Sequence, residues 1–274
     1  MTEIQYKSIT LTPDRWATFH CLVKGFVVRN EVDLKAHENQ SKNPWFCSPC
    51  IPYKECDARG LPTAAEAEKL SKIKSDFDAL LKRESTGFFG RFFGAPTSVF
   101  VGSRTGGGIF QPIYYGTEDF FKEPLGDLIR KHGLANSTFA LGNDSEWENY
   151  HFALHPGPAL SHLLLCHAQL ELRKQGGDRL IESRAVDHNF LFSDKGDRER
   201  FIRVIENELS PTFPAKVTRM SGPNEQRFGV TVTVEHAMEL PTIECFIVLF
   251  AKQAFGLGGE YDGFGAIEIH DQKS

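Results

Sequence analysis

The chain has 274 residues, of which 41% are hydrophobic and 24% are charged, and its formal net charge at pH 7 is −5. This composition indicates an ordinary soluble globular protein, and the length suits two domains. The first residues contain no apolar signal segment, and no run approaches the ~18 apolar residues of a membrane-spanning helix. We therefore expect a cytoplasmic protein without membrane contact.

The net negative charge comes from the second half of the chain. Residues 1–177 carry 20 basic and 20 acidic side chains, whereas residues 178–274 carry 11 basic and 16 acidic ones. Direct nucleic-acid binding needs cationic surface to meet the phosphates, so this distribution argues against it. Two interpretations remain, a plain solvated acidic surface or a face for a basic protein partner.

The first half is predicted to contain strands, two helices and a hairpin. Thr63 and Glu66 form a capping-box pattern at the start of the clearest helix, and three consecutive glycines from Gly106 mark the hairpin turn. In chain order we expect a strand pair at 16–34, an extended segment at 44–53, a helix at 61–84, a hairpin at 97–116, a helix from 117 or 119 to 132, and a last strand at Trp147–Leu154.

The second half follows a proline- and glycine-containing linker at His155–Pro158. We therefore predict domains at 1–157 and 158–274. An opening helix at 159–174 is expected to precede a strand at 188–192, a helix at 194–209, strands at 215–220 and 227–236, a helix at 240–255 and a strand at 264–269. This β-α-β-β-α-β order predicts a ferredoxin-like domain, an antiparallel sheet with two helices on one face. The first half has a related order, so we expect an α+β protein built from two such sandwiches.

Two segments of the second half carry a family resemblance. They are DHNFLFSD, which begins at Asp187, and GGEYDGFG, which begins at Gly258. With the predicted element order, residues 160–270 resemble the regulators of ribonuclease E activity, type B, although Phe264 stands where tryptophan is common in that family. The resemblance implies an acidic, non-catalytic, cytoplasmic, ferredoxin-like protein that inhibits the RNA-degrading endonuclease by binding it away from its active site. We expect no cofactor.

The first half resembles an uncharacterised bacterial domain family. The resemblance lies in DRW at Asp14, in CDARGLPT at Cys56 and in DSEWENYHFALHP at Asp144. That family occurs beside the first one in bacterial chains and has no established function. It therefore implies an α+β fold and no chemistry.

The second half offers its motif residues for partner binding. We predict that GLGGEYDGFG forms a turn from the long helix into an edge strand, since its glycines suit a tight turn. Glu260 and Asp262 are then available to a basic partner, and Tyr261 and Phe264 anchor the turn. The predicted binding residues are Asp187, His188, Glu260, Tyr261, Asp262 and Phe264.

Other motifs offer weaker chemistry. Cys47 and Cys50 have the CxxC spacing of a metal or redox site, and Cys56 could add a ligand, but in a strand residues three apart face opposite ways. A small metal or redox protein centred on this pair is one alternative, and an interaction module of an unrelated pathway is another. The Phe-rich segment at Gly87–Pro96 is either a core segment or an exposed aromatic patch.

Overall fold

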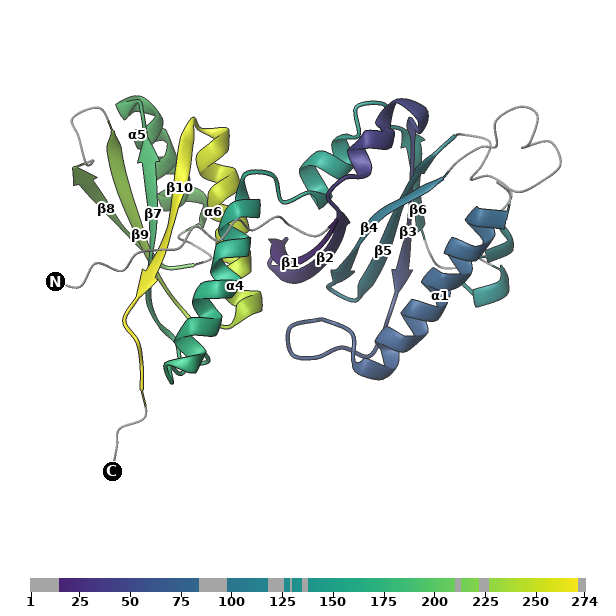
Figure 1. The fold of residues 1–274 in the computed structure, drawn as a ribbon, viewed down its shortest axis with the longest axis horizontal. Helices are drawn as coiled ribbons and strands as arrows, with labels where there is room; N and C mark the ends of the chain where they lie inside the picture. The colour runs from purple at the N-terminus through teal and green to yellow at the C-terminus, as the bar shows by residue number, and fades with distance from the viewer. Residues whose placement is uncertain are drawn as a thin grey trace.

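The computed structural model describes residues 15–83, 98–117, 126–128, 130–134, 138–209, 213–221 and 227–270. Two antiparallel sheets lie side by side, a six-stranded one formed by the first half and a four-stranded one formed by the second (Figure 1). The α+β class predicted from the sequence is confirmed. The Phe-rich segment Gly87–Pro96 lies outside the described residues. Among the described helices, none combines the length and apolar character that a membrane span requires.

The six-stranded sheet has the order β1-β2-β4-β5-β3-β6, and all its neighbouring strands are antiparallel. Its strands are β1 (Trp16–Val23), β2 (Phe26–Asp33), β3 (Trp45–Pro52), β4 (Val99–Gly106), β5 (Ile109–Gly116) and β6 (Thr138–Asn143). Both predicted hairpins are present. Each turn has two central residues with positive φ, Lys24-Gly25 and Gly107-Gly108, which matches the twist of the flanking strands.

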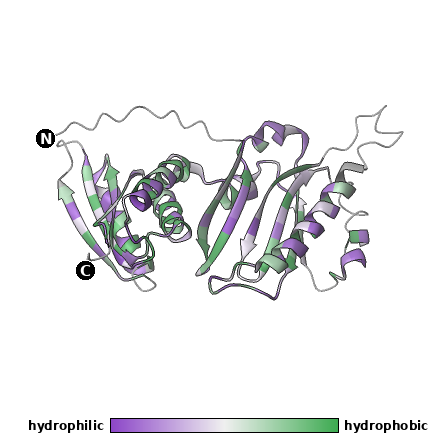
Figure 2. Cartoon of the chain, turned by 60° about the horizontal axis from the view of Figure 1, so that its bottom comes forward, coloured by the Kyte–Doolittle hydropathy of each residue, from purple (hydrophilic) through white to green (hydrophobic). Residues whose placement is uncertain are grey.

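Helices cover both faces of this sheet. They are η1 (Ala36–Lys42), α1 (Ala64–Arg83), a helical segment at 126–128 and 130–132, and the π-helical turn η3 (Asn149–Leu154). Thr63 caps α1, since its hydroxyl accepts the Glu66 N–H at 3.4 Å. Figure 2 shows α1 as mainly hydrophilic, as expected for a helix with one face on a sheet and the other in water.

The second half has the ferredoxin-like order β10-β7-β9-β8. After η4 (Gly157–Ala159) and α4 (Leu160–Gln175), its elements are β7 (Arg184–Phe192), α5 (Lys195–Val204), which continues as η5 (Ile205–Leu209), β8 (Ala215–Ser221), β9 (Phe228–His236), α6 (Leu240–Gly256) and β10 (Gly259–Ala266). In the first half, β3, α1, β4, β5, the helical segment at 126–128 and 130–132, and β6 repeat this layout, because their strands have the order β4-β5-β3-β6. The β1–β2 hairpin extends that sheet at one edge.

The prediction of a strand at Trp147–Leu154 is wrong. The buried residues there are Trp147, Tyr150 and Leu154, which follow a helical period, whereas Phe152 is 77% exposed. The Asp144 carboxylate accepts the backbone N–H groups of residues 148 and 149 and so fixes the start of a helical turn. The last strand of the first half is β6, which pairs with β3.

The prediction of a turn over the motif is also wrong, because the motif forms most of β10. The turn is limited to Leu257-Gly258, and β10 then pairs with β7 as an edge strand. A bulge interrupts the pairing between Tyr261 and Gly263, whose φ is +101°. Gly259 and Tyr261 are buried while Glu260 and Asp262 are exposed, and the segment pairs with β7, which is the alternation of an extended strand.

One apolar core reaches across both halves. It includes Phe19 of β1, Tyr150 of η3, Phe190 of β7 and Ile247 of α6, and α6 packs against β1. A second, smaller core lies between α1 and the six-stranded sheet, around Phe77 and Tyr114. The domain boundary at His155–Pro158 stays a prediction.

Candidate functional site

The four-stranded sheet has one face buried under helices and one face toward solvent. Along β7, Val186, His188 and Phe190 are buried, and the Phe190 ring contacts Phe201 of α5 and Phe250 of α6. The alternate residues point the other way: Ala185 and Asp187 are exposed, and Asn189 and Leu191 are half-buried. This solvent side is the part of the second half that no described helix covers (Figure 1).

Polar side chains form cross-strand pairs on the solvent side. Thr233 donates its hydroxyl to Asp187 Oδ1 at 2.6 Å, and Thr231 donates to Asn189 Oδ1 at 2.9 Å. We call this surface the open face, and it comprises Asp187, Asn189, Thr233, Glu235 and Glu260, the buried Thr231 and, on β8, Lys216 and Thr218. Its three carboxylates outnumber two nearby cations, which are Lys216, cross-strand from Thr233, and Arg227, which pairs with Glu260 at 3.2 Å.

The motif strand β10 places two carboxylates at the edge of this sheet. Glu260 and Asp262 are exposed, and Phe264 is half-buried. Asp262 occupies the bulge, which turns it out of the regular alternation of the strand. Burial lowers the pKa of His162 on α4, and the Asp262 charge opposes that shift, so the carboxylate lies near α4. The acidic residues thus extend from the open face around the β10 edge.

The two remaining motif residues form a hydrogen-bonded relay inside the core. His236 Nδ1 lies 2.7 Å from the carbonyl oxygen of Ala237, which only accepts, so this nitrogen carries a proton. Its Nε2 then accepts from His188 Nε2 at 3.1 Å, and His188 Nδ1 accepts the Tyr261 hydroxyl at 2.9 Å. Burial lowers the pKa of both histidines and raises that of Tyr261, which keeps all three rings neutral.

His188 and Tyr261 are therefore placed where a partner surface does not touch them. Their side chains are 0% and 4% exposed, and their hydrogen bonds hold β10 to β7 and β9. The sequence predicts both as binding residues, whereas in the structure both are buried and their hydrogen bonds connect the strand that carries Glu260 and Asp262 to its neighbours. A binding role stays a prediction for Asp187, Glu260, Asp262 and Phe264.

The comparisons with known proteins point to this same half. Residues 168–266 match the family model described as Regulator of ribonuclease activity B. The matched segment includes β7, β10 and the whole open face, so the resemblance of the second half is supported. The predicted resemblance of the first half to an uncharacterised bacterial family finds no support. A search of curated proteins finds no match.

Two solved structures show weak similarity over most of the chain. An unknown protein from Galdieria sulphuraria is 9% identical, with 83% of this chain and 99% of that chain covered and a TM-score of 0.21. A putative glycine cleavage system transcriptional repressor is 7% identical, with coverage of 82% and 98% and a TM-score of 0.22. These scores are low, so the fold assignment rests on the strand order.

The cysteines considered as metal or redox residues are separated by the first sheet. Cys47 is buried in the core under α1, and burial raises the pKa of its thiol to about 12, so it is not a thiolate at neutral pH. Cys50 faces the opposite side, where its sulfur accepts from Gln111 at 3.0 Å, and Cys56 is exposed. Within the described ranges no group of three His, Cys, Asp or Glu residues could hold a metal ion.

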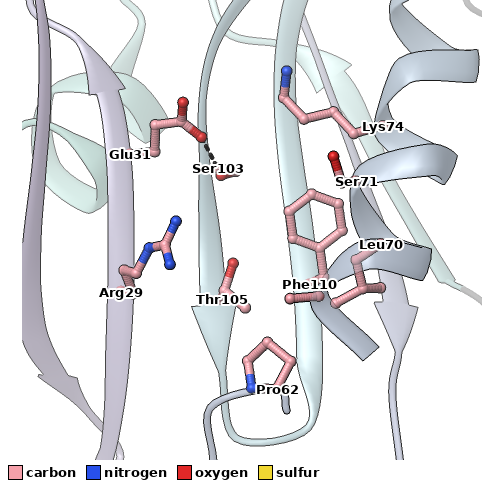
Figure 3. A pocket seen from close by; sticks show the side chains of 10 residues that line it. Arg29, Glu31, Pro62, Leu70, Ser71, Lys74, Ser103, Thr105 and Phe110 are labelled. Atoms are coloured by element: carbon pink, nitrogen blue, oxygen red, sulfur yellow. Dashed lines mark hydrogen bonds between the residues drawn. The ribbon is translucent and has the colours of Figure 1, made fainter. Parts of the chain in front are cut away.

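A groove of about 170 Å³ lies between α1 and strands β2 and β4 (Figure 3). Leu70 and Phe110 form its apolar part, and Arg29, Glu31 and Lys74 bring both signs of charge. Ser103 donates to Glu31 at 3.3 Å, as drawn in Figure 3. Because its charges are mixed, the groove indicates no particular class of ligand.

Sequence reasoning missed two charged residues of α6. Glu244 is 1% exposed, and Lys252 is half-buried, within a helix whose other residues are mostly apolar. The signal was available, because a single carboxylate and a single amine interrupt the apolar run IECFIVLFAKQAF. Such residues are rarely buried unless they are paired or face a polar cavity.

Proposed function

We propose that this chain is a non-catalytic regulatory protein of the bacterial cytoplasm whose second half binds a protein partner. The match of residues 168–266 with the family model of Regulator of ribonuclease activity B carries the proposal. The partner proposed on that basis is a ribonuclease E-like endonuclease, and binding slows its cleavage of RNA. The proposal requires no cofactor and no contact between this chain and RNA.

The open face supports the proposal through its charge and its rigid support. Asp187, Glu260 and Asp262 are exposed and lie on adjacent strands of one sheet. A surface with this sign of charge attracts a basic partner and speeds its association, and added salt weakens that attraction. The relay beneath the face fixes β10, so these carboxylates are held in place before the partner arrives.

An RNA-cleavage assay with purified components tests this function. The rate of cleavage by a ribonuclease E-like endonuclease is measured as the full chain is added, and we expect the rate to fall in proportion to complex formation. The variant D187N/E260Q/D262N removes three charges from the proposed surface without changing side-chain size. It should inhibit at least about tenfold less well, the effect of losing one or two good charge contacts.

The control variant removes three exposed carboxylates elsewhere in the same half. Glu171, Glu206 and Glu239 lie on α4, on η5 and before α6, away from the open face. E171Q/E206Q/E239Q has the same net charge as the test variant and should inhibit like the unaltered chain. Equally weakened inhibition by both variants would show that net charge, rather than the position of the charges on the open face, determines inhibition. A cleavage rate unaffected by the unaltered chain would refute the proposed function.

A further inference from the structure

A cavity of about 240 Å³ lies between the six-stranded sheet and α6, on the opposite face of that sheet from the groove of Figure 3. Both halves of the chain contribute to its wall. The side chains that matter are Cys21 and Val23 of β1, Arg104 of β4, Phe152 of η3, and Val248 and Lys252 of α6. Sites between structural units are common places for small-molecule binding.

Among the described residues that line this cavity, two are cations and none is a carboxylate. Lys252 donates to the backbone oxygen of Phe152 at 3.0 Å and forms no ion pair within the described residues. Burial lowers the pKa of Lys252; Cys21 opposes that shift, and the nearby charge of Arg104 adds to it. Each cation thus stands close to the other without a counter-ion, which is an unfavourable arrangement in a partly buried place.

The guanidinium of Arg104 also lacks a hydrogen-bond partner in the part of the chain that the structure describes. Its Nε is buried and unpaired, and Oδ1 of Asn30, its direct cross-strand neighbour, is buried and unpaired as well. The amide of Asn30 donates to Cys21 Sγ at 3.0 Å and is thereby held beside the cavity. The buried Nε–H donor of Arg104 costs free energy while it has no acceptor, so an acceptor that enters the cavity beside it is favoured, whereas Oδ1 of Asn30 is itself an acceptor and gains nothing from an anion.

We propose that this cavity binds a small organic anion. Its phosphate or carboxylate group lies between Arg104 and Lys252, where it accepts hydrogen bonds from both and supplies the missing negative charge. Its apolar part lies against Val23, Val248 and the ring of Phe152, which is 77% exposed. The volume exceeds the roughly 150 Å³ that holds a benzene ring, so an acid group with one ring fits.

Calorimetric titration of the full chain tests the site with four probes. Phenyl phosphate and benzoate combine a ring with either acid group, benzyl alcohol is a neutral analogue, and inorganic phosphate lacks the apolar part. We expect both ring-bearing anions to bind and to raise the melting temperature, benzyl alcohol to do neither, and inorganic phosphate to bind more weakly. The tighter of the two ring-bearing anions identifies the acid group. Equal binding of benzyl alcohol would overturn the proposal.

Three variants locate the binding. R104M and K252M each remove one charge from the cavity and should weaken binding of the anionic probes by about ten- to a hundredfold. R29M is the matched control, because Arg29 is an exposed cation without an ion pair, within the described residues, on the other face of the same sheet. It should bind like the unaltered chain.

The unliganded variants give a second readout. If Lys252 serves a ligand, K252M removes a charge that has no counter-ion, so its melting temperature without probe should rise while the probe-induced increase disappears. If Lys252 is only structural, K252M should melt at a lower temperature, and probe binding should persist. Unchanged probe affinity in both R104M and K252M would refute the site. These measurements need no endonuclease, so their outcome is independent of the proposed regulatory function.

Discussion

Glu244 on α6 binds His20 on β1 across the junction of the two sheets, with Oε2 2.6 Å from His20 Nδ1 and 3.0 Å from its backbone nitrogen. The other carboxylate oxygen lies 2.6 Å from Nε2 of His167 on α4. A carboxylate that is 1% exposed is tolerated only when it is paired and hydrogen-bonded. Glu244 therefore ties together three elements from both halves of the chain.

This cluster makes the stability of the junction depend on pH. The hydrogen bond to Glu244 raises the pKa of His167 above its ordinary value of 6.5. Burial opposes ionisation of Glu244, but hydrogen bonds from His167 and His20 outweigh it and lower its pKa below 4.5. The stability that His167 adds to the folded chain is fully present below pH 6.5 and is lost as pH rises through the raised pKa. The stability that Glu244 adds is fully present above pH 4.5 and is lost as pH falls through the lowered pKa. Both are fully present between pH 4.5 and pH 6.5.

The first prediction is that H167Q flattens the pH dependence of stability above pH 6. Glutamine can still donate a hydrogen bond to Glu244 but cannot become charged. The advantage of the unaltered chain over H167Q, measured by urea denaturation, should be largest near pH 5.5 and smaller at pH 8.5. The difference should stay below about 1 kcal/mol, because the His167 side chain is 48% exposed to solvent. Parallel profiles for H167Q and the unaltered chain would contradict this prediction.

The second prediction concerns the relay under the open face. Tyr261→Phe removes only the hydroxyl that donates to His188 Nδ1, which leaves a buried acceptor unpaired. We expect the free energy of unfolding to fall by about 1–3 kcal/mol in urea denaturation. Tyr53→Phe is the matched control, because its hydroxyl donates to the carbonyl of the half-buried Gly60, where water can replace it. That variant should lose less than about 1 kcal/mol.

A double-mutant cycle separates the hydrogen bond from general packing. If the Tyr261–His188 bond carries the effect, Y261F should cost less in an H188L background than in the unaltered chain. Additive costs would show that the two side chains act independently and that their hydrogen bond does not hold β10 in place.

The fold of the second half could be predicted because its sequence periods are unambiguous. Val230, Val232 and Val234 alternate with polar residues, and all three are buried in β9. Asp194 caps α5 by accepting the Asp197 N–H at 3.0 Å. At Trp147–Leu154 the apolar positions fit both a strand and a helix. The helical turn forms because the Asp144 carboxylate accepts the backbone N–H groups at its start. Local pattern was therefore sufficient where only one period fitted.

The junction cluster and the cavity could not be predicted in the same way. Glu244 is separated from His20 by 224 positions and from His167 by 77, so no local spacing connects them. The packing of α6 against β1 brings them together, and that packing depends on how the two halves meet. The sequence did single out Asp187, Glu260 and Asp262. It could not show that the neighbouring His188 and Tyr261 are linked to His236, because that link requires the register of three strands.

The third prediction tests whether the motif glycines serve packing or flexibility. A Cβ on Gly259 would lie 2.2 Å from Cε1 of Phe192, a ring that is 1% exposed and cannot move without disturbing the core. Gly259→Ala should therefore lower the free energy of unfolding by about 1–3 kcal/mol in urea denaturation. Gly265 lies in the same strand, and a Cβ there meets nothing within 4 Å. Gly265→Ala should stay within about 0.5 kcal/mol of the unaltered chain. Equal losses in the two variants would mean that the destabilisation comes from replacing a glycine of the strand and not from contact with the Phe192 ring.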